Sequence, residues 1–348
     1  MYEITPIRLW LYPKIHMTFD FLSILFNATL IFLILTKSSK AFRPYAIMLL
    51  SVSLQELFVA LSAEFAMQRI IPIKEALTFE FHGLCLNFTP YSCVFAHCIT
   101  MISTAFVYSS FPFFFWFRYR VLHDPPRSTL KIGLICLLFY LPPLVTGSLW
   151  IFRIDLWIAE IRQIWYDANF TAFDKSPRVM AGGFRSIWSI RILPMILWVT
   201  LPVFPCYAVS IYYRQKFLKD IQQAAMSEKT KKAQHNIVQS LTIQALMPLF
   251  PMTVAAMFNY QQFQLPYHEY VPYFDEWPIL AVTIVSAFNP LLTMFFILPY
   301  RTALQKFYRQ VRKQPTKRSG DYERPSIFDL GSRRRGSVMP SSTQRSFH

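Results

Sequence analysis

The sequence predicts an all-α membrane protein in which seven helices cross the bilayer, with the N-terminus outside and the C-terminus in the cytoplasm. Three observations lead to this prediction. Hydrophobic residues make up 54% of the 348 residues and charged residues only 16%, whereas soluble proteins carry about 25% charged residues. Seven apolar runs are long enough to cross a hydrocarbon core, which takes about 20 helical residues. Basic residues also gather in alternate connections between these runs.

The apolar runs differ in how uniform they are. The second run contains Glu56 and Glu64, and the fifth is interrupted by Pro194, Pro202 and Pro205. Membrane helices tolerate proline because neighbouring segments satisfy the backbone groups that it frees. We therefore keep both runs as spans. The expected helices cover residues 18–36, 45–66, 91–117, 132–152, 190–213, 237–258 and 277–298.

The distribution of Lys and Arg predicts the orientation. Of the 35 basic residues, 25 follow the first, third, fifth and seventh runs, and the connection 259–276 has none. Cytoplasmic connections of membrane proteins retain the excess of Lys and Arg. Residues 1–17 are therefore expected to form an extracellular N-terminus, 18–312 a seven-helix transmembrane domain, and 313–348 a disordered basic cytoplasmic tail.

Two residues in polar segments are candidates for modification. Asn169 begins an Asn-Phe-Thr triplet in the long fourth connection, and such triplets are glycosylated where they face the outside. Ser337 follows three arginines and a glycine in the tail, which resembles the substrate of a basophilic kinase. Alternatively, the tail is a solvated basic segment beside anionic membrane lipid.

Composition and motifs argue against several classes of function. A net charge of +16 suggests nucleic acid as a partner in a soluble protein, but here the charge flanks apolar runs, so no nucleic-acid partner is expected. The sequence contains no Gly-rich phosphate loop, nucleophile elbow or His-Glu-x-x-His motif. Its five cysteines show no metal-ligand spacing,. No enzymatic activity, cofactor or metal site is expected.

Polar residues inside spans are the strongest clue to a site, because each costs several kcal/mol unless it faces protein or a water-filled cavity. Glu56 lies about midway along the second run, as a charged hub or a carboxyl satisfied by a neighbouring helix. His97 fits a hydrogen bond to a neighbouring helix better than a metal. For each residue, simple interhelical hydrogen bonding is the alternative. The ligand-pocket candidates are Glu56, Glu64, His97, Arg191 and Gln244.

A second group of candidates lies on the predicted cytoplasmic side. The third run ends in basic residues that could dock a partner or cap helix carbonyls, and the fifth connection presents a basic face. Pro248 and Pro251 could make the sixth helix a pivot, which suits signal transfer better than a pore. The partner-facing candidates are Arg118, Tyr119, Arg120, Lys229, Lys231, Tyr300 and Arg301.

The chain lacks common marks of rhodopsin-like receptors. Phe117 precedes Arg118-Tyr119 where that class has Asp, and Thr293 stands where it has Tyr after Asn-Pro-x-x. The pattern instead resembles the nematode chemoreceptors of the Str superfamily, and most closely serpentine receptor class delta. The resemblance runs from about residue 15 to 310 and is carried by Asn27, 30–34, 37–40, Tyr45, 68–72, Gly83, Cys85, Cys93, 118–122, 239–244, Pro248, 289–291 and 299–301.

This resemblance implies a chemosensory receptor in the ciliary plasma membrane of sensory neurons. It implies an external small-molecule or peptide ligand and a heterotrimeric G protein, which the partner-facing candidates would contact. Cys85 and Cys93 could form a short extracellular bridge. Alternatively, they remain two reduced thiols, because a helix between them would hold them too far apart to bond. A ligand-gated channel or transporter is the alternative function, and a structural or trafficking protein of the ciliary membrane is a third.

Overall fold

The computed structural model describes residues 6–39, 42–73, 75–123, 129–151, 158–167, 180–190, 192–223, 228–263 and 276–313. The chain divides into two units between Lys306 and Phe307. The helical bundle belongs to the first unit. Of the second, the described residues are 307–313, the last part of helix α11 (Leu298–Lys313). The predicted sites Arg191, Asn169 and Ser337 lie outside the described residues.

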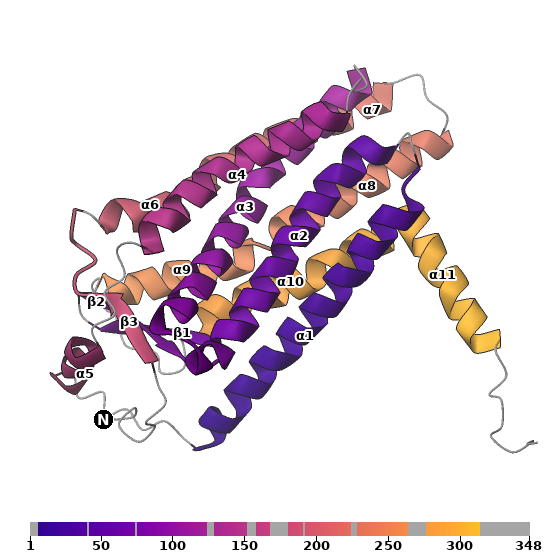
Figure 1. Cartoon of the computed structure of the whole chain (residues 1–348). Coiled ribbons are helices and arrows are strands. Elements are labelled where there is room, and N and C mark those ends of the chain that lie inside the picture. Colours follow the sequence, from indigo (N-terminus) through magenta and orange to yellow (C-terminus); the bar gives the residue numbers. More distant parts are fainter. Residues whose placement is uncertain are drawn as a thin grey trace, which may run out of the picture. The chain divides into compact units, whose positions relative to one another are not determined.

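Within the described chain, six helical segments are long and apolar enough to cross a membrane, and the protein is a multi-pass membrane protein. Each of the seven predicted runs overlaps a helix or a pair of helices, so the helical membrane fold is confirmed. Figure 1 shows their order. The long helices are α1 (Pro6–Lys37), α2 (Arg43–Ala66), α3 (Pro90–His123), α4 (Thr129–Ile151), α6 (Leu193–Thr200) with α7 (Val203–Gln223), α8 (Glu228–Leu246) with α9 (Leu249–Gln262), and α10 (Trp277–Phe296).

Two predicted spans are each broken into a pair of helices. The break between α6 and α7 falls at Pro202, and that between α8 and α9 falls at Pro248. Proline lacks the N–H that would bond to the carbonyl four residues earlier and its ring clashes with that carbonyl.

Helix α1 differs from the prediction at its start. It begins at Pro6, well before the expected start of the first span at residue 18.

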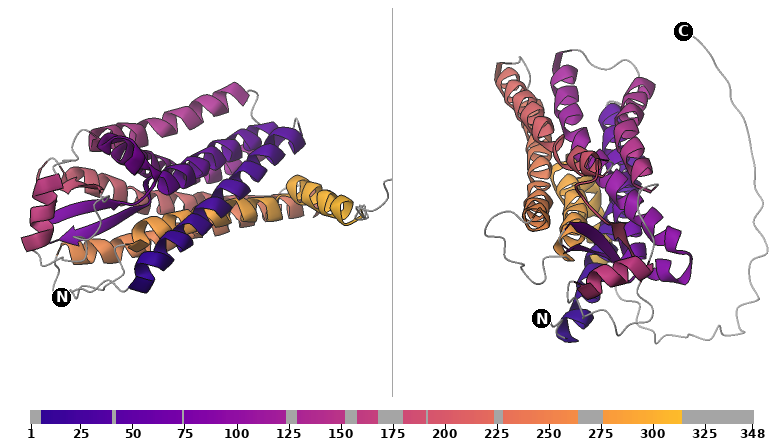
Figure 2. Two further views of the ribbon diagram at one scale, coloured as in Figure 1. Left: turned by 60° about the horizontal axis from the view of Figure 1, so that its bottom comes forward. Right: turned by 90° about the vertical axis from the view of Figure 1, so that its left-hand side faces the viewer.

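A three-stranded antiparallel sheet adds to the helices an element that the hydropathy pattern did not predict. Strands β1 (Gln68–Ile73) and β2 (Ala76–Phe81) follow α2, and β3 (Met180–Phe184) pairs with β2. The register places Gln68 opposite Phe81 and Leu77 opposite Phe184. We call this end of the bundle the sheet end and the opposite end the far end; helix α5 (Ile158–Asp167) lies beside the sheet (Figures 1 and 2).

The bundle has two apolar core clusters. One surrounds Phe114 and Leu241 toward the far end, and the other includes Phe79 and Phe81 of the sheet. Large apolar side chains such as Leu138 also cover the outside of the helices, as expected where helices meet lipid. By contrast, polar residues of the spans are collected inside the bundle. This inward polarity positions the candidate site.

Candidate functional site

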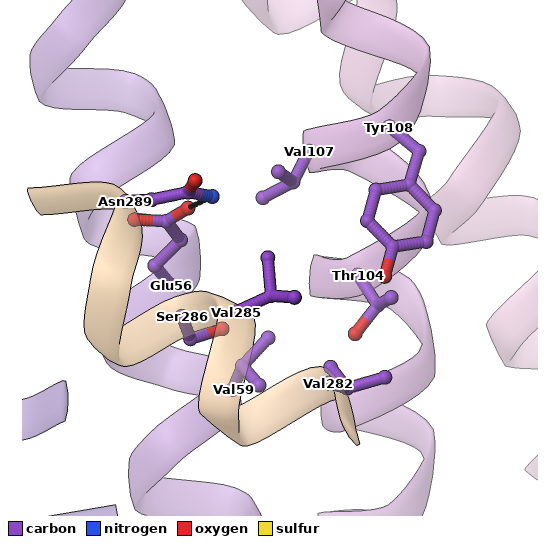
Figure 3. A pocket seen from close by; sticks show the side chains of 9 residues that line it. All are labelled: Glu56, Val59, Thr104, Val107, Tyr108, Val282, Val285, Ser286 and Asn289. Carbon is purple, nitrogen blue, oxygen red and sulfur yellow. Dashed lines mark hydrogen bonds between the residues drawn. The ribbon is translucent and has the colours of Figure 1, made fainter. Parts of the chain in front are cut away.

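A buried hydrogen-bonded group joins three helices around Asn289 of α10. The Asn289 side-chain amide donates to Glu56 Oε1 of α2 at 2.5 Å (Figure 3). The Gln244 amide of α8 donates to the Asn289 backbone oxygen at 3.2 Å and to the Thr293 hydroxyl. All four side chains are at most 7% exposed. We call Glu56, Gln244, Asn289 and Thr293 the polar junction.

The proline after Asn289 extends these contacts to α1. Pro290 has no backbone N–H, so the carbonyl of Ser286 four residues earlier lacks its helical partner. The Asn27 amide of α1 donates to this Ser286 oxygen at 3.0 Å. Asn27 thereby satisfies a backbone group that would otherwise be unpaired in the apolar interior, which costs several kcal/mol. The helix defect at Pro290 thus fixes where α1 meets α10.

Two small cavities flank the polar junction. One is lined by Glu56, Thr104, Tyr108 and Asn289 together with four valines and Ser286 (Figure 3). The other lies on the far side of Glu56, against Gln244 and apolar residues of α1, α2 and α3. Each has room for roughly one water molecule. In this conformation neither cavity accommodates an organic ligand, and the contacts of the junction link α2, α8 and α10.

The other pocket candidates lie apart from the junction. Glu64 is on α2 two turns beyond Glu56, beside α1. His97 is fully buried at the sheet end, where its Nδ1 lies 2.6 Å from Gln68 Oε1 and its ring packs 4.7 Å from that of Phe79. The predicted hydrogen bond of His97 is present, but its partner belongs to strand β1, because the unpredicted sheet covers this part of α3. Of the candidates whose side chains are described, only Glu56 and Gln244 share a partner.

At the far end, two of the partner-facing candidates are covered. The Arg118 guanidinium lies 3.3 Å from the centre of the Tyr45 ring of α2, and Arg118 is 5% exposed. Tyr300 is fully buried and its hydroxyl lies 3.0 Å from the Ser38 hydroxyl. Burial raises the pKa of Tyr300 to about 12, so this side chain stays neutral. Tyr45 therefore covers Arg118, and Ser38 and Phe42 contact Tyr300.

The remaining candidates at this end are more accessible. Arg120 is exposed and Arg301 is half-buried, and Lys231 lies 3.5 Å from Glu228. The Tyr119 ring packs against that of Tyr213 at 5.8 Å, and the Lys216 ammonium lies over it. The side chain of Lys229 lies outside the part described. These side chains are therefore more accessible than the covered Arg118, and the basic surface near α7 and α8 stays a prediction.

The structure brings together two cysteines whose state the sequence left open, and two polar residues that the sequence did not single out. Cys85 and Cys93 are joined in a disulfide with a Cα–Cα distance of 5.1 Å. No continuous helix holds them apart, because Cys85 lies in a short 3₁₀ turn (Leu84–Asn87) and Cys93 near the start of α3. His16 was missed because the first span was expected to begin at residue 18, and Asp20, which lies inside that span, was not selected as a polar candidate. Their signal was available: His16, Asp20, Ser23 and Asn27 recur at helical spacing, and all are fully buried,.

Removing the Glu56 carboxyl should destabilise the protein by leaving the Asn289 amide unpaired. Glu56→Leu is expected to lower the free energy of unfolding by about 1–3 kcal/mol, whereas Glu56→Gln should cost less because its amide oxygen still accepts from Asn289. Thermal unfolding in detergent measures both. Ser51→Ala, which removes a hydrogen bond within α2, is the control. Strict additivity of Glu56→Leu with Asn289→Leu would argue against the contact.

The chain is similar to known proteins over most of its length. The family model described as "Serpentine type 7TM GPCR chemoreceptor Srd" matches residues 13–306. Among curated proteins of Caenorhabditis elegans, serpentine receptor class delta-3 is 30% identical, with 82% of this chain and 84% of that protein covered. Serpentine receptor class delta-1 is 27% identical over 86% and 82% of the two chains, and class delta-18 is 27% identical over 84% and 87%.

Proposed function

Because the chain belongs to the Srd family of serpentine chemoreceptors, we propose that it binds an external chemical and activates a heterotrimeric G protein. The ligand is a small molecule or a peptide that enters the sheet-end half of the bundle, between α3, the α6–α7 pair, the α8–α9 pair and α10. The receptor works in the plasma membrane of sensory cilia. The sheet end faces outward and the far end faces the cytoplasm.

The observation that best supports this proposal is the covered Arg118 beside a broken helix. Arg118 and Tyr300 are buried against Tyr45 and Phe42, next to basic residues of α7 and α8. Helix α8 is joined to α9 at the Pro248 break, and its Gln244 holds the polar junction. Opening this closed arrangement requires that Gln244 leaves Asn289 and Thr293 and that Arg118 leaves Tyr45.

We propose the following sequence of events. Ligand binding near the sheet end moves α9 relative to α8 about Pro248, and Gln244 then releases Asn289 and Thr293. The far end of α8 swings away from α3 and opens a cleft to the G protein. The cleft is lined by Arg118, Tyr119, Arg120, Lys229, Lys231, Tyr300 and Arg301, whose positive charge suits an acidic surface on the partner.

Orientation is the premise of this mechanism and can be tested without a ligand. With an epitope tag at each end, we expect antibody to reach the N-terminal tag on intact cells and the C-terminal tag only after permeabilisation. A reporter with a known N-out topology in the same cells is the control. Access to the C-terminal tag on intact cells would place the basic connections outside and exclude the proposed cytoplasmic cleft.

Signalling is tested by G-protein dissociation in cells that express the receptor and are given a panel of volatile and water-soluble odorants. At least one odorant should produce a response that Arg118→Ala reduces about tenfold or more at equal surface level. Lys14→Ala, which removes a cation over Trp10 near the start of α1, should keep the response. A ligand-evoked current that persists when G proteins are blocked would instead support the ligand-gated channel.

A further inference from the structure

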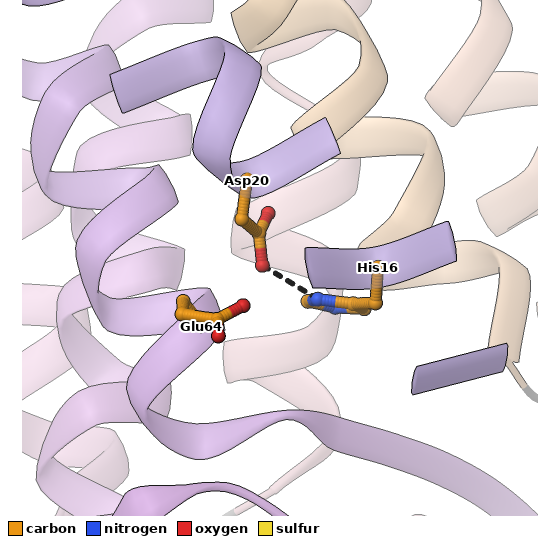
Figure 4. Close-up of side chains that lie close together, drawn as sticks. All are labelled: His16, Asp20 and Glu64. Atoms are coloured by element: carbon orange, nitrogen blue, oxygen red, sulfur yellow. Dashed lines mark ion pairs between the residues drawn. The ribbon is translucent and has the colours of Figure 1, made fainter. Parts of the chain in front are cut away.

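Three side chains with metal-ligand chemistry meet between α1 and α2. His16 Nδ1 lies 2.5 Å from Asp20 Oδ2, one turn along α1, and Glu64 of α2 faces both (Figure 4). One ligand atom from each residue lies within 4.8 Å of the other two. His16 and Asp20 are fully buried, while Glu64 is half-buried. The group lies toward the sheet end, apart from the polar junction.

The His16 side chain is incompletely satisfied. Its Nε2 atom has no hydrogen-bond partner among the described residues, although it has no access to solvent. A buried polar atom without a partner costs about 1–3 kcal/mol. The imidazole lies against Asp20 and points toward the other two side chains (Figure 4). Its unpartnered nitrogen is therefore a second sign, separate from the short distances, that the group is incomplete without something bound.

The charges of the group also call for a cation. Two carboxylates and one imidazole in the apolar interior carry up to two negative charges, and even a protonated imidazole neutralises only one of them. Burying an unpaired charge is costly. A divalent ion bound to a neutral imidazole and two carboxylates makes the set neutral.

We propose that His16, Asp20 and Glu64 bind a divalent transition metal ion of the zinc type. Zinc combines imidazole nitrogen and carboxylate oxygen ligands in a tetrahedral set, whereas Ca²⁺ and Mg²⁺ prefer oxygen ligands alone. The spacing of His16 and Asp20, four residues apart on one helix face, is one that zinc sites use. Three protein ligands leave the fourth position to water.

Binding requires only small movements. Ligand atoms around a tetrahedral zinc lie about 3.3 Å apart, given bonds of about 2.0–2.1 Å. His16 Nδ1 and Asp20 Oδ2, now 2.5 Å apart, must therefore separate slightly, and rotations of the three side chains adjust the other distances, which lie within 4.8 Å. Thr283 of α10 lies beside Asp20 and can hold the carboxylate in place, as partners of metal ligands commonly do. The half-buried Glu64 gives the ion a route in. The bound ion joins α1 to α2.

The test is zinc binding by the full-length receptor in lipid nanodiscs, freed of metal with a chelator. Calorimetric titration with Zn²⁺ should show one ion per chain, and the same ion should raise the Tm. Equal concentrations of Ca²⁺ or Mg²⁺ should do neither. This readout needs no G protein, so its outcome is separate from that of the signalling test. If zinc does not bind the wild-type receptor, the proposal is wrong.

Variants assign the site. His16→Gln and Glu64→Gln should each weaken zinc binding by about tenfold or more, whereas His16→Cys should retain it because a thiolate is also a zinc ligand. His82→Gln is the matched control, since His82 also lies 3.3 Å from a carboxylate at the sheet end, that of Glu80. If His16→Gln does not fold, Glu64→Gln decides. Unchanged binding in the Gln variants, or loss in His82→Gln, overturns the assignment.

Discussion

Gly83→Ala is expected to lower the stability of the protein severely, by about 3 kcal/mol. A Cβ atom at this position would lie 2.2 Å from the backbone oxygen of Phe65 and 2.7 Å from the backbone carbon of Ala66. Backbone atoms at the end of α2 cannot rotate away as a side chain does. The Gly83 N–H also donates to the Ala66 oxygen at 3.0 Å, so moving the segment apart would break this bond. Only glycine, which has no Cβ, allows this segment to lie so close to the backbone of Phe65 and Ala66.

The measurement is the Tm of purified receptor, together with the amount that elutes as a single species. Gly133→Ala is the matched control, because a Cβ there meets nothing within 4 Å. This glycine lies within α4, where alanine is better by about 0.5–1 kcal/mol, so the Tm should stay or rise slightly. Equal stability of Gly83→Ala and the wild type would show that the end of α2 and the segment at Gly83 do not approach this closely.

Cys85→Ser is expected to lower the free energy of unfolding by about 2–3 kcal/mol. The disulfide to Cys93 closes a loop with a sequence separation of 8, and the loss of chain entropy in the unfolded state from a loop of this size is worth about that much. Both sulfurs are fully buried within the sheet-end core. The loss should therefore also loosen the start of α3.

A double variant separates the bridge from the loss of two apolar side chains. If the bridge forms, Cys85→Ser and Cys93→Ser should each cost nearly as much as the double variant, because either removes it. Thermal unfolding with and without reductant measures this, and reductant should affect only proteins that retain both cysteines. The free, partly buried Cys206 provides the control Cys206→Ser. Two small and additive losses would mean that the cysteines are reduced.

The sequence singled out two members of the polar junction, by their position in a span and not by their partners. Glu56 and Gln244 were selected because polar groups inside spans must face protein. Their shared partner Asn289 had appeared only as part of an Asn-Pro motif, and that motif acquires a physical role once Asn27 is seen to bond the Ser286 carbonyl freed by Pro290. For Arg118 the sequence offered docking of a partner or capping of helix carbonyls, and it gave no sign that the Tyr45 ring covers the guanidinium.

Sequence patterns alone were sufficient to predict the helical membrane class and the family. Hydropathy, proline positions and ordered motifs are local properties of the chain, so they need no knowledge of packing. The tertiary structure decided which polar residues meet. Whether Glu64 faces His16 and Asp20, or Asn289 faces Glu56, depends on the rotation and tilt of helices far apart in sequence. The sheet depended on it too, since β2 and β3 are separated by two spans.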